Sequence, residues 1–158
     1  MKTIPVKVQG ISASMPMLVD DDLFQRLSGL RWSNDGADYA QAKMNGEKIR
    51  AHNLIVMCPK GCHTDHIDCN KLNNQRSNLR VCRASENLMN RGKQKNNSSG
   101  FKGVSLDKRC GRWKAEIRKE KKRFYLGYFS TAEIAYTAYL AAAKKLHGNF
   151  AYKDMFGT

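Results

Sequence analysis

The sequence lacks any long hydrophobic run. No segment of its 158 residues approaches the roughly 20 apolar residues that a transmembrane helix needs. The start, MKTIPVKVQGISASMPM, has no continuous apolar stretch of the kind found in signal peptides, and Pro5 interrupts it. A helix lying on a membrane surface would need bulky apolar anchors opposite a basic face, and none is evident. We therefore expect an intracellular, soluble protein with no membrane partner.

The sequence is also short of acidic residues. It has 28 Lys and Arg against 14 Asp and Glu, which gives a formal net charge of +14 and an isoelectric point near 9.8. A field of this sign attracts polyanions and repels most basic proteins. Nucleic acid is therefore the predicted partner. The length allows one ordinary domain or two or three small ones.

The five cysteines include no second closely spaced pair. Cys58 and Cys62 are separated by three residues in CPKGC, whereas Cys69 and Cys82 are isolated. Structural zinc sites usually combine two compact ligand pairs, so no structural zinc is expected. The odd number, without an export signal, indicates reduced thiols rather than a disulfide framework. We interpret these four cysteines as small buried hydrophobes.

The first part of the chain, residues 1–57, is expected to be rich in β-strands. VDDDLFQRLSGLRW predicts a short helix, because acidic residues lie in its first turn and its apolar residues have helical spacing up to Gly29. Residues 37–56 predict two strand-like runs joined at Asn45-Gly46. That dipeptide favours a type I′ hairpin, whose two central residues need positive φ.

The second part holds many small polar residues. HTDHIDC predicts a short strand, NKLNNQRSN a loop, NLRV a second strand, and ASENLMNR a helix that begins near Ala84 or Ser85. Residues 92–100, GKQKNNSSG, contain no apolar residue and are predicted to be a linker. We therefore expect an N-terminal domain in residues 1–91, which combines the β-rich region with a core unit at about residues 50–91. A C-terminal domain is expected in residues 101–158.

The C-terminal part alternates apolar and charged residues. FKGVSL, GRWKAEIRK and KRFYLGYF predict three strands, and in the last of them Phe124 and Leu126 are expected to oppose Arg123 and Tyr125. STAEIAYTAYLAAAKKLHG predicts a helix that begins with a capping box from Ser130 to Glu133 and ends at a glycine. The expected architecture is a three-stranded antiparallel sheet packed on one helix, within an α+β chain.

Residues 63–91 also contain groups suited to phosphodiester hydrolysis, which needs a base and a cation. His66 has an ordinary pKa that suits a base near neutral pH. Asp65 beside it offers a hard oxygen ligand for Mg²⁺ or Mn²⁺. Neighbouring side chains of a strand point to opposite faces, so the two could serve one phosphate only if the strand is distorted or the phosphate crosses its edge.

DHID, NNQRSNLRV and ENLMNR, in this order, resemble the HNH endonucleases, whose fold is the ββα-metal motif, in the form common among homing endonucleases of phages and mobile introns. The resemblance covers about residues 50–91. It implies that His66 is the general base, that Asn78 orients it and supports the loop, and that Asp65 and Asn87 hold one divalent cation.

Asn87 stands where the family name has a histidine. An amide oxygen is a neutral, hard ligand, so this position favours Mg²⁺ or Mn²⁺ over zinc. Ordinary roles are assigned to the other asparagines of the loop, Asn70, Asn73 and Asn74, as turn formers. His52 and His63 are candidates to support the site, with plain packing as the alternative. The arginines of this part, Arg76, Arg80, Arg83 and Arg91, are either phosphate clamps or solvated surface residues.

SGFKGVSLDKRCGRWKAEIRKEKKRFYLGYFSTAEIAYTAYLAAAKKLHGNFA, residues 99–151, resembles the plant APETALA and ethylene-response-factor DNA-binding domain. The resemblance implies that the sheet lies in the major groove of double-stranded DNA. Ser105 replaces an arginine of that family, so its base readout does not transfer. By position or by charge, the candidate DNA-binding residues are Lys102, Arg112, Lys114, Glu116, Arg118, Arg123 and Tyr125.

The charge distribution agrees independently. Between Arg91 and Arg123 thirteen residues are basic and three acidic, an excess of ten. The leading hypothesis is a site-directed DNA endonuclease encoded by a phage or mobile element, a monomer or weak dimer that nicks DNA, with the N-terminal strands bracing the nuclease or adding contacts. The alternatives are a non-catalytic DNA-binding regulator on a degenerate nuclease scaffold, and an RNA-binding protein. An RNA-binding sheet would be expected to present several stacking aromatics, and Tyr125 is the only clear candidate.

Overall fold

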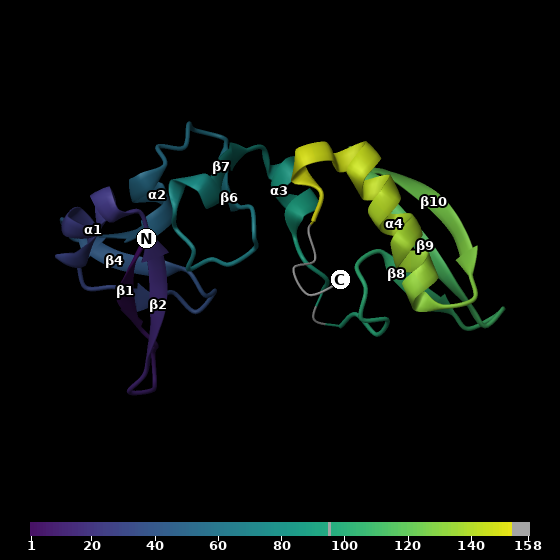
Figure 1. Cartoon of the computed structure of the whole chain (residues 1–158), viewed down its shortest axis with the longest axis horizontal. Helices are drawn as coiled ribbons and strands as arrows, with labels where there is room; N and C mark the ends of the chain where they lie inside the picture. The colour runs from purple at the N-terminus through teal and green to yellow at the C-terminus, as the bar shows by residue number, and fades with distance from the viewer. Residues whose placement is uncertain (95, 153–158) are drawn as a thin grey trace. The chain divides into compact units, whose positions relative to one another are not determined.

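The computed structural model describes residues 1–94 and 96–152 (Figure 1). Residue 95 of the predicted linker and residues 153–158 of the predicted C-terminal domain lie outside this range. The chain divides into two compact units, Met1–Ala84 and Ser85–Thr158. Their described parts contain three sheets together with helices, so the predicted α+β class is confirmed. No helix of the described ranges has the length and apolar character to cross a membrane.

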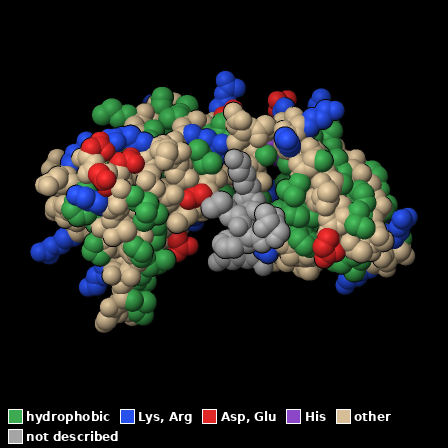
Figure 2. Space-filling model, viewed as in Figure 1, with side chains coloured by type: hydrophobic (Ala, Val, Ile, Leu, Met, Phe, Trp, Pro, Cys, Tyr) green, Lys and Arg blue, Asp and Glu red, His purple; other side chains and the backbone are tan. Residues whose placement is uncertain are grey.

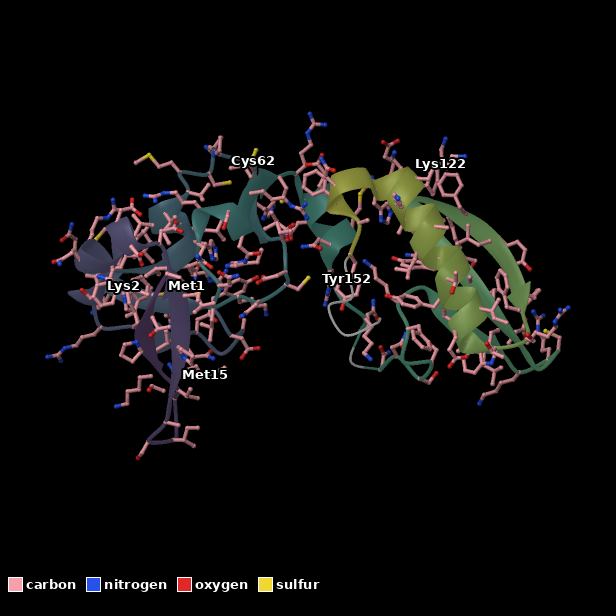
Figure 3. The ribbon with its side chains drawn as sticks, in the orientation of Figure 1. Met1, Lys2, Met15, Cys62, Lys122 and Tyr152 are labelled. Atoms are coloured by element: carbon pink, nitrogen blue, oxygen red, sulfur yellow. The ribbon has the colours of Figure 1, made fainter. Side chains whose placement is uncertain are left out.

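The first unit is built on a five-stranded sheet with the order β2-β1-β3-β4-β5. β1 pairs antiparallel with β2 and parallel with β3. The β1–β2 hairpin carries the exposed Met15, which is labelled in Figure 3. The strands are β1 (Lys2–Lys7), β2 (Ser14–Val19), β3 (Ser33–Asn34), β4 (Ala40–Met44) and β5 (Glu47–Arg50).

Helix α1 (Asp21–Ser28) covers the core of this unit and confirms the predicted helix. Its first turn is acidic, and Leu23 and Leu27 are buried among the apolar side chains of β1 and β2. The Trp32 indole N–H donates to the Leu27 carbonyl over 2.8 Å, so the chain that leaves the helix is tied to its last turn. The apolar stripe of the sequence thus becomes the helix face that packs on the sheet.

The predicted hairpin at Asn45-Gly46 is confirmed, since β4 and β5 pair directly across it and both residues have positive φ. The second strand is shorter than predicted. It ends at Arg50, and residues 51–55 form helix α2 (Ala51–Ile55). Ala51, Leu54 and Ile55 are spaced as on one helix face and all contact the core. This spacing outweighs the strand preference of the β-branched residues.

The predicted strand, loop, strand and helix follow in order. They are β6 (His63–His66), a loop that ends in the 3₁₀ turn Arg76–Asn78, β7 (Leu79–Cys82) and α3 (Ala84–Asn90), which begins at the boundary between the units. None of the five cysteines, all of which lie in the described ranges, forms a disulfide bond. Their interpretation as buried hydrophobes is correct for Cys82 and wrong for Cys69, which is exposed because it lies in a turn with φ of 61°.

The second unit contains the predicted three-stranded sheet, with the order β10-β9-β8, packed on one helix. In Figure 1, α4 lies in front of the sheet. Ala115 and Ile117 of the middle strand are buried against Tyr136 and Tyr139 of the helix. The elements are β8 (Val104–Asp107), β9 (Arg112–Lys119), β10 (Lys122–Phe129) and α4 (Ala132–His147), followed by the 3₁₀ turn Gly148–Phe150.

The predicted cap of the helix in this unit is wrong. The cap of α4 is Thr131, whose hydroxyl accepts from the Ile134 N–H over 3.3 Å, and not Ser130. Phe124 lies on the helix side of the sheet with Ile117, opposite Arg123 and Tyr125 as predicted, and is 38% exposed. It pairs with Ile117 near the end of the sheet, and a bulge between Tyr125 and Gly127 shifts the register beyond it. A bulge inserts one residue and reverses the facing of those that follow.

Candidate active site and DNA-binding face

Strand β6 places Asp65 and His66 in the interior of the first unit. Their exposed fractions are 6% and 4%. Asp65 lies opposite Arg80 and His66 opposite Leu79 in the antiparallel pair with β7. Beyond the strand, the Ile67 N–H still donates to the Asn78 carbonyl over 2.9 Å. The hairpin therefore holds the acid and the histidine at the start of the polar loop.

The His66 ring is held by an amide. Its Nε2 lies 3.3 Å from Oδ1 of Asn74. Because a carboxamide oxygen only accepts, this contact favours the tautomer with the proton on Nε2. Burial lowers the pKa of His66, while the Asn74 contact and the carboxylates of Asp68 and Asp65 oppose that shift. The imidazole is consequently neutral near pH 7, the form that can accept a proton.

Asn74 is a site residue that sequence reasoning missed. Its side chain is fully buried, and its Nδ2 donates to the Lys71 carbonyl over 3.3 Å. Its backbone N–H donates to the Leu18 carbonyl of β2, and the Leu18 N–H donates to the Leu72 carbonyl. The N-terminal sheet thus anchors the segment that meets His66. Nothing local in the sequence distinguishes Asn74 from Asn73, because the direction of the loop decides which amide turns inward.

Asn78 braces the loop. Its Nδ2 donates to Asp68 Oδ1 and to the Asn73 carbonyl, each over 2.8 Å, and its Oδ1 accepts from the Asp68 N–H over 3.0 Å. These bonds tie the two ends of the segment between β6 and β7. Support of the loop therefore comes from Asn78, and the side-chain contact with His66 comes from Asn74.

Asp65 forms a buried ion pair with Arg80. The guanidinium Nε and Nη2 donate to Oδ2 over 2.8 and 2.6 Å. Arg80 is therefore neither a solvated residue nor an open phosphate clamp. Its charge offsets the cost of burying the carboxylate.

The two predicted metal ligands lie on different elements. Asp65 is on β6 and Asn87 is on α3, in the second unit. Within residues 1–94 and 96–152, no three His, Cys, Asp or Glu side chains gather as a metal-binding group. The donor chemistry of the pair, one carboxylate and one amide oxygen, fits a hard cation such as Mg²⁺ or Mn²⁺.

The second unit brings six of the seven candidate DNA-binding residues to one face of the sheet, opposite α4. Register pairs Arg118 with Arg123 and Glu116 with Tyr125, and Lys114 and Arg112 continue the same face of β9. Glu116 accepts ion pairs from Lys114 at 3.0 Å and Arg123 at 3.7 Å. Figure 2 shows the opposite side, where hydrophobic side chains gather over α4. Ile134 and Leu140 of this helix are exposed. The outer face of the sheet is the basic one.

The bulge adds Tyr128 to this outer face. Simple alternation would place it with Phe124 on the side of the helix, but it pairs with Lys114 and packs edge-on against Tyr125, with ring centroids 5.6 Å apart. Its hydroxyl donates to Asp107 Oδ2 over 2.7 Å. Hydrogen bonds from Arg109 and from Tyr128 lower the pKa of Asp107. The face therefore carries two aromatic rings rather than the one expected from the sequence.

Lys102 lies apart from this face, in the turn before β8. Its ammonium donates to the Met89 carbonyl of α3 over 2.6 Å and lies 5.3 Å from the centroid of the Tyr152 ring. In the structure its charge supports the packing of the second unit.

Comparisons with known proteins match both parts of the chain. A family model described as "AP2 domain" matches residues 99–149, and one described as "HNH endonuclease" matches residues 57–89. The resemblances inferred from the sequence are thereby confirmed. No solved structure matches the chain.

Two viral relatives and a plant protein illustrate the range of similar proteins. Protein 3.8 of Escherichia phage T7 is 37% identical over 93 residues, covering 59% of this chain and 76% of that protein. The uncharacterized HNH endonuclease L560 of Acanthamoeba polyphaga mimivirus is 37% identical over 110 residues, 66% of this chain and 56% of its own length. The ethylene-responsive transcription factor ERN1 of Medicago truncatula is 38% identical over 80 residues, covering 49% of this chain and 30% of that protein.

Proposed function

Because an HNH endonuclease model and an AP2 domain model match successive parts of the chain, we propose that it is a site-directed DNA endonuclease of the homing type. It hydrolyses phosphodiester bonds with one divalent metal and nicks double-stranded DNA as a monomer or weak dimer. The nuclease core occupies residues 50–91 within an N-terminal domain of residues 1–91. Residues 92–100 link it to the DNA-binding domain of residues 101–158.

The observation that carries the proposal is the state of His66. It is a buried histidine held neutral by its surroundings, with an amide oxygen at Nε2 and a buried carboxylate on the preceding residue. With the proton on Nε2, Nδ1 is the nitrogen that accepts a proton from the attacking water. Asn74 orients the ring, and Asn78 keeps the loop in the shape that presents Asn74.

By the resemblance to the HNH endonucleases, Asp65 and Asn87 would hold the cation. Bound Mg²⁺ or Mn²⁺ supplies a positive charge that stabilises the phosphate and the leaving oxygen. Arg80 fixes the direction of the Asp65 carboxylate through its two hydrogen bonds. This contact prepares a buried anionic oxygen as a ligand.

The outer face of the second sheet binds the DNA. Arg118 and Arg123 have the planar fork that makes paired hydrogen bonds to guanine or to phosphate, and Lys114 mainly contributes salt-dependent attraction. Glu116 restrains Lys114 and Arg123, which reduces the entropy they lose on binding. Tyr125 and Tyr128 provide apolar contact between the charges.

A plasmid assay tests the nuclease. Purified protein is incubated with supercoiled DNA and Mg²⁺ or Mn²⁺, and nicked circles are counted over time. His66→Ala should lower the rate by about 10²- to 10⁴-fold, the usual contribution of a general base. His63→Ala, an exposed histidine on the same strand, is the matched control and should cut normally. Chelation with EDTA should stop cleavage, and binding of labelled duplex should persist in His66→Ala.

The alternative, a DNA-binding regulator on a degenerate nuclease scaffold, makes the opposite forecast. Wild-type protein would then bind DNA and never cut it with either metal, even when the substrate includes the genomic region around its own gene. Cleavage that His66→Ala leaves unchanged would equally contradict the assignment of the base.

A further inference from the structure

His66 also contacts two aromatic rings supplied by the N-terminal sheet region. The His52 ring of α2 packs edge-on against it, with centroids 5.3 Å apart and planes at 86°. The Tyr39 ring lies 6.0 Å from His66 and 5.2 Å from His52. The three rings therefore form one mutually contacting cluster, far apart in sequence and close in space.

Tyr39 is itself fixed from several directions. The Arg50 guanidinium lies 4.5 Å from its ring centroid and the Lys71 ammonium 4.8 Å. Asp35 accepts from the Arg50 Nε over 2.8 Å and from the Tyr39 backbone N–H over 3.1 Å. Lys71 donates to the Ala37 carbonyl over 2.6 Å. The Asp35–Arg50 ion pair, the loop around Ala37 and the Tyr39 ring thus form a rigid support. The two histidines pack against this support.

His52 is suited to a role as an uncharged packing group. It is 6% exposed, and burial followed by the neighbouring His66 lowers its pKa to about 4. It is therefore neutral near pH 7, and it presents a flat ring without a competing charge. Edge-to-face packing is a favoured arrangement of aromatic rings.

We propose that His52 and Tyr39 are positioning residues for the His66 ring, so that the N-terminal sheet is a working part of the nuclease. A single contact at Nε2, such as that with Asn74, does not by itself prevent rotation of the ring plane. The perpendicular His52 ring and the tilted Tyr39 ring restrict this rotation and so aim Nδ1. This inference rests on the proposed role of His66 as the base.

The test uses ring and non-ring replacements in the full-length protein. His52→Leu removes the ring and should lower kcat for nicking by roughly 10- to 100-fold, as expected for a displaced catalytic group. His52→Phe keeps a ring and should stay within about threefold of wild type, since shape and not basicity is required. Phe24→Leu is the matched control, because it removes a ring from the same core at α1 and should keep its kcat. KM and affinity for duplex DNA should change little in all three.

A histidine-ring NMR spectrum provides a second readout that needs no cleavage. With only four histidines, the His66 signals can be assigned by substitution. They should shift strongly in His52→Leu, which loses the ring current, and less in His52→Phe. A folded His52→Leu that cuts at the wild-type rate, or a His66 signal that does not move, would overturn the proposal. So would a folded His52→Phe as slow as His52→Leu, which would indicate a chemical role. If wild-type protein does not cut, the nuclease proposal fails, whereas the spectra still decide the ring contact.

Discussion

Acidification should destabilise the N-terminal unit through His52, by an amount that follows from its burial. The folded-state pKa is about 4 and the ordinary value 6.5. Above pH 6.5 His52 is neutral in both the folded and the unfolded state, so it does not lower the free energy of unfolding. Below it, the unfolded chain takes up a proton that the folded chain refuses, so stability falls until about pH 4. At about 1.4 kcal/mol per pKa unit, the loss is about 3 kcal/mol.

The measurement compares wild type with His52→Phe by urea unfolding between pH 7.5 and pH 4 in steps of about half a unit. Each step between pH 6.5 and pH 4 should cost wild type about 0.7 kcal/mol through His52. The two units can unfold separately, so the probe must report on the first. Trp32 is buried there, and a Trp113→Phe background makes it the only tryptophan. Both proteins also lose stability through carboxylates such as Asp35. Burial raises the pKa of Asp35, but hydrogen bonds from Ala37, Tyr39 and Arg50 lower it, and the net shift is downward.

The difference between the two proteins isolates His52. The free energy of unfolding should depend on pH more steeply in wild type, by close to one proton per molecule between pH 6.5 and 4. His63→Ala, which changes an exposed histidine, should keep the wild-type slope. Parallel curves for wild type and His52→Phe would refute the reasoning, because they would show that the folded state accepts the proton as readily as the unfolded chain.

Three further outcomes concern the second unit. Gly103→Ala should destabilise it by about 3 kcal/mol, measured by thermal unfolding followed at its tryptophan, because φ is +75° and a Cβ there would meet a buried tyrosine ring; an unchanged melting temperature would contradict this packing. Thr131→Ala should cost about 1 kcal/mol in the same assay and Ser130→Ala almost nothing, and the reverse order would restore the capping box expected from the sequence. Arg118→Ala should weaken binding to a specific duplex by roughly tenfold and Lys119→Ala by less, measured by fluorescence anisotropy; equal small losses would count against recognition by the sheet.

The periodic elements were predictable because their signals are local. Helix α1 and the three strands of the second unit follow from the spacing of apolar residues, and the β4–β5 hairpin follows from Asn45-Gly46. Errors occurred where a tertiary contact overrides local preference. Residues 51–55 turn into a helix to bury one face, and the bulge beyond Tyr125 moves Tyr128 to the outer face.

The site shows the same division. The sequence by itself determined the candidate metal ligand Asp65 and the candidate base His66, because their residue types define their chemistry. Only the tertiary structure decided which groups touch them: Asn74, Arg80 and His52. Each of these contacts joins residues separated by a loop or a strand, and their partners depend on how loops turn and sheets pair. The direction of loops and the pairing of sheets cannot be predicted from a sequence pattern, because they arise only when distant segments are folded against each other.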